Sequence, residues 1–249
     1  MKPIKLIVLG LLFLSLIIGC QKDSLESFGE FEPEIIVLQV TPALEHWLPK
    51  VAGCSKDIPE FGAITRVKPR AELTLQESDL ILRLGERMDD DPYVAVMGVE
   101  EIVVVAGKDV PLSALNLEIL QAIFAGEISD WAEIPGVLDE QVREPEPIKP
   151  LTYPPGHEVE ILFKHAYLHD MAISTSVQTY STAAFLEELL SIHPTGIAYL
   201  LKSQMPKDLR TLQIITDEPI ANQQYVLAIT SKAPEGRLKA LLVCLQNTQ

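Results

Sequence analysis

Residues able to ligate a metal ion or to act as a nucleophile are scarce in this chain. Its 249 residues include three cysteines and five histidines, and they form no Cys-x-x-Cys motif. His165 and His169 are four positions apart, but no third ligand lies nearby in the sequence. Gly-x-Ser-x-Gly and His-Glu-x-x-His motifs are also missing. These absences argue against an enzyme, and we expect no catalytic residue, metal ion or cofactor.

Positive charge is in short supply as well. The chain has 20 lysines and arginines against 35 aspartates and glutamates, which gives a formal net charge of −15. Nucleic acids and anionic membrane surfaces attract basic proteins through their phosphate groups. The acidic balance therefore argues against nucleic acid as a partner. It also provides no long-range field that would steer an anion toward the protein.

The first residues have the pattern of an exported protein. A start with two lysines precedes an apolar run at 6–18, which is typical of a secretory signal and too short to count safely as a spanning helix. Ile17–Cys20 resembles the lipobox of bacterial lipoproteins, in which the cysteine is lipidated and becomes the mature N-terminus. We expect a signal peptide at 1–19, a lipid on Cys20 and a polar tether at 20–33. A plain signal peptide or anchor helix is the alternative.

The most regular stretch of the chain lies near its centre. Apolar residues recur at helical spacing across Leu117–Phe124, which predicts a short helix with one buried face. Asn116 occupies the N-cap position, and Gly126 occupies the left-handed position after the helix. Asp130 and Glu133 then have the spacing of a capping box around a tryptophan, which predicts a second helix start.

This stretch contains the string Ile-Phe-x-Gly-x-Ile-x-x-Trp, which resembles a segment of the phosphate-type substrate-binding proteins of ABC transporters. His193–Leu200 is similar to that family's Pro-Gly-x-Ile-Gly-Tyr turn and strand. The resemblance implies an α/β, two-lobed type II periplasmic-binding-protein fold. Each lobe would be a mixed sheet flanked by helices, with a cleft between the lobes. An ordinary corner between two helices is the alternative interpretation of the central string.

The order of strand-like and helical segments also favours an α/β fold. Ile35–Val40 is a continuous apolar run, typical of a strand covered on both faces. The resemblance divides the chain into a discontinuous first lobe at 30–105 and 218–249 and a second lobe at 106–217. Cys54 and Cys244 would both lie in the first lobe. In an oxidising space they either pair or remain separate small buried residues.

Two further segments bear on ligand binding. Met88–Pro92 contains three consecutive aspartates, which we expect to be solvated because they lack the alternating spacing of a calcium loop. Thr41 follows the first strand and precedes Pro42 at a helix start. Ligands of open α/β sheets bind beyond the carboxyl ends of strands, where helix N-termini offer free N–H groups. Thr41 is therefore a candidate ligand residue, although a helix cap without a ligand explains it equally well.

The resemblance thins at Tyr153–Phe163. Phosphate-type proteins have an arginine here, followed by a Ser-Gly-Thr loop. If Gly156 and Phe163 keep the register, Tyr153 replaces the arginine and residues 157–159, His-Glu-Val, replace the loop. A bound dianion needs charge-assisted donors in place of water, and these side chains do not supply them. We expect weak phosphate binding or none.

The resemblance nevertheless indicates where a ligand would lie, between Thr41 and the Tyr153–His157 loop. The candidate ligand residues are Thr41, Tyr153, Gly156, His157, Thr195 and Tyr199. His157 is either a pH-sensitive donor at a helix N-terminus or a surface histidine on an altered loop.

Two functions follow. The first is a monomeric, lipid-anchored solute-binding protein of an ABC importer, located outside the cytoplasm. Its partners would be a small polar or anionic solute and the permease. The second is a sensing or structural module of the same fold whose ligand site has decayed.

The lipid anchor gives the first testable prediction. Cys20→Ser removes the thiol that would carry the lipid, so the variant should be released from membranes. Fractionation by sedimentation measures this, and a variant that sediments with membranes exactly as the wild type does would contradict lipidation.

Overall fold

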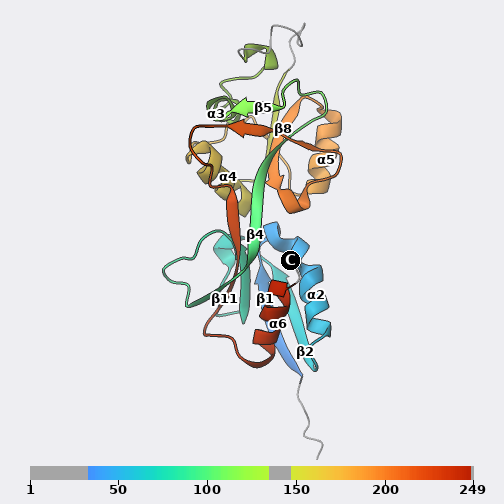
Figure 1. Ribbon diagram of the computed structural model, residues 1–249, viewed down its shortest axis with the longest axis vertical. Coiled ribbons are helices and arrows are strands. Elements are labelled where there is room, and N and C mark those ends of the chain that lie inside the picture. Colours follow the sequence, from blue (N-terminus) through green and yellow to red (C-terminus); the bar gives the residue numbers. More distant parts are fainter. Residues whose placement is uncertain (1–32, 135–146, 248–249) are drawn as a thin grey trace, which may run out of the picture. The chain divides into compact units, whose positions relative to one another are not determined.

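The computed structural model describes residues 33–134 and 147–247 (Figure 1). Of these, residues 34–134 and 147–247 belong to one compact unit. The predicted signal peptide, Cys20 and nearly all of the predicted tether lie outside the described residues. Within the described part, no helix is long and apolar enough to cross a membrane.

A nine-stranded mixed sheet positions the other elements. Its order is β2-β1-β3-β11-β4-β8-β6-β7, and β9 also pairs with β4. The strands are β1 (Glu34–Val40), β2 (Phe61–Val67), β3 (Leu80–Leu84), β4 (Tyr93–Ala106), β6 (Lys149–Thr152), β7 (Gln178–Thr179), β8 (Gly196–Leu201), β9 (Arg210–Thr211) and β11 (Gln223–Thr230). A separate parallel pair is formed by β5 (Ala114–Asn116) and β10 (Gln213–Ile215).

Helices connect and cover these strands. The α-helices are α2 (Leu48–Lys56), α3 (Leu117–Ala125), α4 (Glu158–Leu168), α5 (Ala183–Ile192) and α6 (Gly236–Asn247). Short 3-10 helices are η1 (Pro42–Trp47), η2 (Arg70–Glu72), η3 (Trp131–Glu133) and η4 (Lys202–Gln204).

Strand β4 takes part in two sets of pairings. Its residues 93–101 pair antiparallel with β11, and its residues 102–106 pair antiparallel with β8. We call β1, β2, β3, β11 and the first part of β4 the first strand group. The second strand group contains β6, β7, β8, β9 and the last part of β4. Figure 1 shows β4, in green, running from one group into the other.

The elements predicted from periodicity are present. Strand β1 includes the predicted run and pairs in parallel with β2 and β3, as expected for a covered strand. Helix α3 spans the predicted helix and ends at Gly126, whose φ of 80° is the left-handed conformation that glycine adopts without strain. Trp131 is fully buried, and its Nε1 donates to the backbone oxygen of Thr195 at 3.0 Å.

The capping box at the second helix start takes a modified form. Asp130 accepts from the backbone N–H of Ala132 at 2.8 Å, as a cap residue does. The Glu133 carboxylate accepts from the N–H and the hydroxyl of Ser129 at 3.2 and 3.1 Å. In the predicted motif Glu133 would accept from the N–H of Asp130, the cap residue; here it accepts from Ser129, one residue earlier.

The acidic turn differs from its prediction at one residue. Asp91 is 8% exposed and lies 2.6 Å from Nη2 of Arg83, which is itself 2% exposed in β3. The same carboxylate accepts from the N–H of Met88 at 2.8 Å. A guanidinium buried in a strand needs a counter-charge, and Asp91 supplies it. The expectation of three solvated aspartates is wrong for Asp91, whereas Asp89 and Asp90 are exposed.

A disulfide joins helices α2 and α6. Cys54 of α2 and Cys244 of α6 are bonded across 190 positions of the sequence. The two helices lie side by side in Figure 1, in blue and red. The pairing that the sequence left open is therefore present.

This disulfide should contribute strongly to stability. Replacing both cysteines (Cys54→Ala with Cys244→Ala) should lower the free energy of unfolding by about 2–5 kcal/mol, because the bond restricts a long loop in the unfolded chain. Urea denaturation measures the change. Reduced wild type is the control and should approach the double variant, and unchanged midpoints in both would contradict the expectation.

The buried Arg83–Asp91 pair gives a second stability prediction. Asp91→Ala leaves a buried guanidinium without its partner and should destabilise the fold by about 3–5 kcal/mol. Asp89→Ala removes the same charge two residues away at an exposed position and should change stability by less than about 0.5 kcal/mol. Equal effects of the two substitutions in thermal unfolding would show that the pair has no special role.

Candidate functional site

Thr41 lies where β1 ends and η1 begins. It is fully buried, and its N–H donates to the backbone oxygen of Leu82 at 3.2 Å, which continues the strand pairing. Its hydroxyl donates to Oε2 of Glu158 at 2.6 Å, across 117 positions of the sequence. The predicted position of Thr41 at a strand end is thus combined with a partner that the sequence did not indicate.

Glu158 is the first residue of α4 and is 2% exposed. Its Oε1 lies 3.4 Å from Nη1 of Arg70, which also donates to the backbone oxygen of Leu84 at 3.1 Å. We call these three residues the Thr41–Arg70–Glu158 cluster. Burial raises the pKa of the Glu158 carboxyl, although the Thr41 hydroxyl, a backbone hydrogen bond at Leu84 and the Arg70 charge oppose the increase. Ionisation of this carboxyl therefore carries a desolvation cost that its partners offset only in part.

His157 precedes Glu158 and caps α4. Its Nδ1 accepts from the N–H of Val159 at 3.3 Å, and its ring stacks on Tyr153 with centroids 4.2 Å apart. Burial lowers the pKa of His157 to about 4, so the imidazole is neutral at neutral pH. The side chain is partly buried and holds a cap. It offers no positive charge to an anion.

Tyr153 and Tyr199 belong to a cluster of buried aromatic rings. The Tyr199 ring stacks on Phe163 at 3.6 Å between centroids, and its hydroxyl lies 2.5 Å from that of Thr152. The Tyr180 hydroxyl donates to the backbone oxygen of Tyr199. Burial raises the pKa of Tyr153 and of Tyr199. Tyr199 is fully buried, and its side chain packs in the core. Tyr153 stacks one face of its ring on His157.

Two other candidates, Thr195 and Gly156, have hydrogen-bond partners of their own. The Thr195 hydroxyl donates to the backbone oxygen of Pro147 at 2.8 Å, beside the buried Trp131. Gly156 is exposed with a φ of 83°, and its N–H donates to the Glu160 carboxylate at 3.2 Å. Among the described residues, these hydrogen bonds involve neither Thr41 nor Glu158.

A cavity of about 230 Å³ adjoins the loop at 153–157, and we call it the Tyr153–His157 cavity. Its lining comes from η1, the loop, the start of α5 and the end of η4. The lining residues are Pro42, Ala43, Glu45, His46, Tyr153, His157, Ser181, Thr182, Ala183 and Gln204. Two of the predicted ligand residues line it directly, and Pro42 places it next to Thr41. Its lining contains no lysine or arginine.

Hydrogen bonds fix the polar wall of this cavity. Nε2 of His46 lies 2.8 Å from Oε1 of Glu100, and the Gln204 amide lies 2.8 Å from Nδ1 of His46. The same Nδ1 lies 3.1 Å from the backbone oxygen of Ala43, which accepts from the Gln204 amide at 2.9 Å. Burial alone would raise the pKa of Glu100, but hydrogen bonds from His46, Ser203 and Trp47 hold it below its usual value. His46, Glu100 and Gln204 were missed in the sequence because no local motif marks them.

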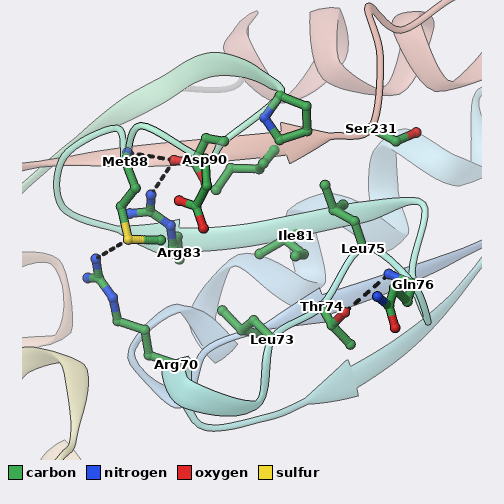
Figure 2. Close-up of a pocket in the computed structure, with 13 residues that line it drawn as sticks. Arg70, Leu73, Thr74, Leu75, Gln76, Ile81, Arg83, Met88, Asp90 and Ser231 are labelled. Carbon is green, nitrogen blue, oxygen red and sulfur yellow. Dashed lines mark hydrogen bonds and ion pairs between the residues drawn. The ribbon is translucent and has the colours of Figure 1, made fainter.

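A larger cavity of about 520 Å³ lies against the first strand group (Figure 2). Ile81 and Ile229 contribute apolar surface, and Arg70 and Arg83 contribute guanidinium groups. Arg83 is committed to the protein itself, since Nη1 donates to the backbone oxygen of Glu86 at 2.8 Å and Nη2 pairs with Asp91. None of the predicted ligand residues lines this cavity. Arg70 connects it to the Thr41–Arg70–Glu158 cluster.

Possible metal ligands do not gather anywhere in the described part of the chain. No group of three or more histidine, cysteine, aspartate or glutamate side chains there is arranged to hold an ion. His165 lies 3.3 Å from Asp170 on the surface, and His169 ends α4 in a left-handed conformation.

Comparisons with known proteins give matches in structure alone. No family model and no curated protein sequence matches the chain. An ABC-type phosphate transport receptor from Vibrio cholerae superposes with a TM-score of 0.67 at 11% identity, covering 86% of this chain and 94% of the receptor. PstS from Borrelia burgdorferi superposes at 0.56 with 12% identity, covering 86% and 93%.

A regulatory domain has the same fold. The Synechocystis CcmR regulatory domain in complex with 2-PG superposes with a TM-score of 0.59 at 15% identity, covering 86% of this chain and 96% of that one. At such identities the likeness demonstrates fold and nothing finer. The predicted fold is confirmed: the chain has the type II periplasmic-binding-protein fold.

Proposed function

We propose that this chain is an extracytoplasmic solute-binding protein that binds a small polar solute and delivers it to an ABC permease. The observation that carries the proposal is the Tyr153–His157 cavity, which lies next to Thr41 and includes Tyr153 and His157 in its wall. Phosphate receptors of the same fold, such as the Vibrio cholerae protein, support a transport role. Lipidated Cys20 would keep this monomeric protein at the membrane.

The chemistry of the cavity favours a neutral solute over a dianion. Hydroxyl, amide and imidazole groups line it, Glu45 adds a carboxylate, and the lining contains no lysine or arginine. His157 is neutral at ordinary pH because burial lowers its pKa to about 4. A dianion would lose its hydration without gaining a lysine or arginine donor from this lining. A polar, uncharged molecule would exchange its hydrogen bonds with water for neutral ones.

The proposed lobes are those predicted from the sequence, at 30–105 with 218–249 and at 106–217. The two strand groups support this division, because β4 changes partners after Glu101. The cavity takes η1 from the first part and the loop and α5 from the second. Closure of two lobes on a solute would therefore enclose this cavity.

A second candidate function is a sensing or structural module without transport. The Synechocystis regulatory domain supports it by sharing the fold. The Glu158 carboxylate supports it too, because it occupies the hydrogen-bonding groups of Thr41 and Arg70 that an anionic solute would need. A ligand found in the Tyr153–His157 cavity would favour the transport role.

The cavity can be tested with a matched pair of substitutions. The full chain, purified in detergent, is screened by thermal shift against sugars, amino acids and oxyanions. A solute at ten times its Kd should raise Tm by about 3–6 °C. Ala183→Phe fills the cavity and should abolish the shift, whereas Ala184→Phe, at the next helix position and outside the lining, should preserve it.

Phosphate affinity provides an independent check of the solute class. Hydrogen bonds to charged groups contribute about 1.5–3 kcal/mol each, so losing two or three of them moves a micromolar site to millimolar or weaker. Calorimetry at neutral pH should detect no tight phosphate binding. Submicromolar binding would contradict the proposed solute class, and no shift with any compound would favour the non-transport module.

A further inference from the structure

The Thr41–Arg70–Glu158 cluster has the composition of an oxyanion-binding site. The Thr41 hydroxyl and the Arg70 guanidinium converge on one carboxylate, which belongs to the first residue of the eleven-residue helix α4. These groups come from three separate segments of the chain, at the end of β1, in η2 and at the start of α4. Hydroxyl and guanidinium donors near a helix N-terminus are groups that bind free carboxylates and phosphates. Here the bound carboxylate belongs to the protein.

The burial of Glu158 is not explained by stability alone. The side chain is 2% exposed and has a single guanidinium at 3.4 Å. Taking a carboxylate out of water is costly, and an apolar side chain of similar volume is often as stable or more stable in such a place. An alanine at position 158 would avoid this desolvation cost while leaving Thr41 and Arg70 unchanged. The donors and the carboxylate therefore form a binding arrangement whose ligand is covalently attached.

We propose that Glu158 is an internal occupant of an oxyanion subsite formed by Thr41 and Arg70 at the start of α4, and that it keeps small carboxylates and other oxyanions out. A tethered group competes at a high effective concentration, so a free anion at ordinary concentrations does not displace it. This inference does not depend on the solute-binding role, because it concerns residues that lie beside the Tyr153–His157 cavity.

Chemical rescue tests the proposal directly. Glu158→Ala deletes a CH₂–COO⁻ group, which has the same heavy atoms as acetate. Acetate should therefore bind in the vacated space and restore the contacts with Thr41 and Arg70. Thermal unfolding of the full chain in detergent is measured in sodium acetate and in sodium chloride at equal ionic strength. At ten times the Kd of acetate, Tm of the variant should be about 3–6 °C higher in acetate.

Glu160 offers a matched control in the same helical turn. It is 7% exposed, and its carboxylate accepts from Gly156 and pairs with Lys164 at 3.5 Å, away from Thr41. Glu160→Ala removes the same charge and should show no acetate-specific shift. Wild type and Glu158→Gln should show none either, because their side chains still fill the subsite. Adding Thr41→Val to Glu158→Ala removes a donor and should weaken the rescue.

Two results would overturn the proposal. One is the absence of an acetate-specific Tm shift in Glu158→Ala, and the other is an equal shift in Glu160→Ala. If Glu158→Ala does not fold in chloride, far-UV circular dichroism provides the readout, and acetate should restore the helical signal. A chain that stays unfolded in acetate counts against the subsite. Screening with Ala183→Phe is unaffected by any of these outcomes, so the two proposals fail separately.

Discussion

Strand β4 has to pair its backbone groups along fourteen residues, and the arrangement of the sheet follows from how it does so. Strand β11 pairs with its first part, and β8 takes over at Ile102. Because one continuous strand serves both strand groups, the loops at the ends of β1 and β6 are brought into contact. The hydrogen bond from Thr41 to Glu158 and the lining of the Tyr153–His157 cavity are both consequences of that arrangement.

In the Thr41–Arg70–Glu158 cluster, the protein's own Glu158 carboxylate takes the place of a bound anion. An overall charge of −15 repels free anions at long range, and the buried Glu158 carboxylate meets the local need of Thr41 and Arg70. Neutral His157 and the stacked Tyr153 ring add no positive charge. The neighbouring cavity is therefore free to bind by hydrogen bonding and shape, the usual basis for recognising uncharged polar molecules.

Local patterns predicted individual helices and strands, and the family resemblance predicted the fold, but neither predicted the contacts within the site. Helix α3, its glycine end and strand β1 could be predicted because periodicity and caps are properties of a few adjacent residues. The partner of Thr41 could not, because Glu158 is 117 positions away and aligns with a glycine in the family that the chain resembles. Asp91 was misassigned for the same reason, since its burial depends on Arg83 in another element. The Tyr199 ring lies 5.9 Å from that of Tyr153, between centroids, and its side chain is packed in the core.

The position of β11 has a consequence for the order in which the fold forms. Strands β3 and β4 are neighbours in sequence, yet they do not pair with each other, because β11 lies between them. A chain emerging from the ribosome therefore carries the unpaired edges of both strands until residues 223–230 have been made. Such non-local pairing slows folding and leaves strand edges open to association with other chains. The first strand group is thus completed last, although most of its residues are synthesised first.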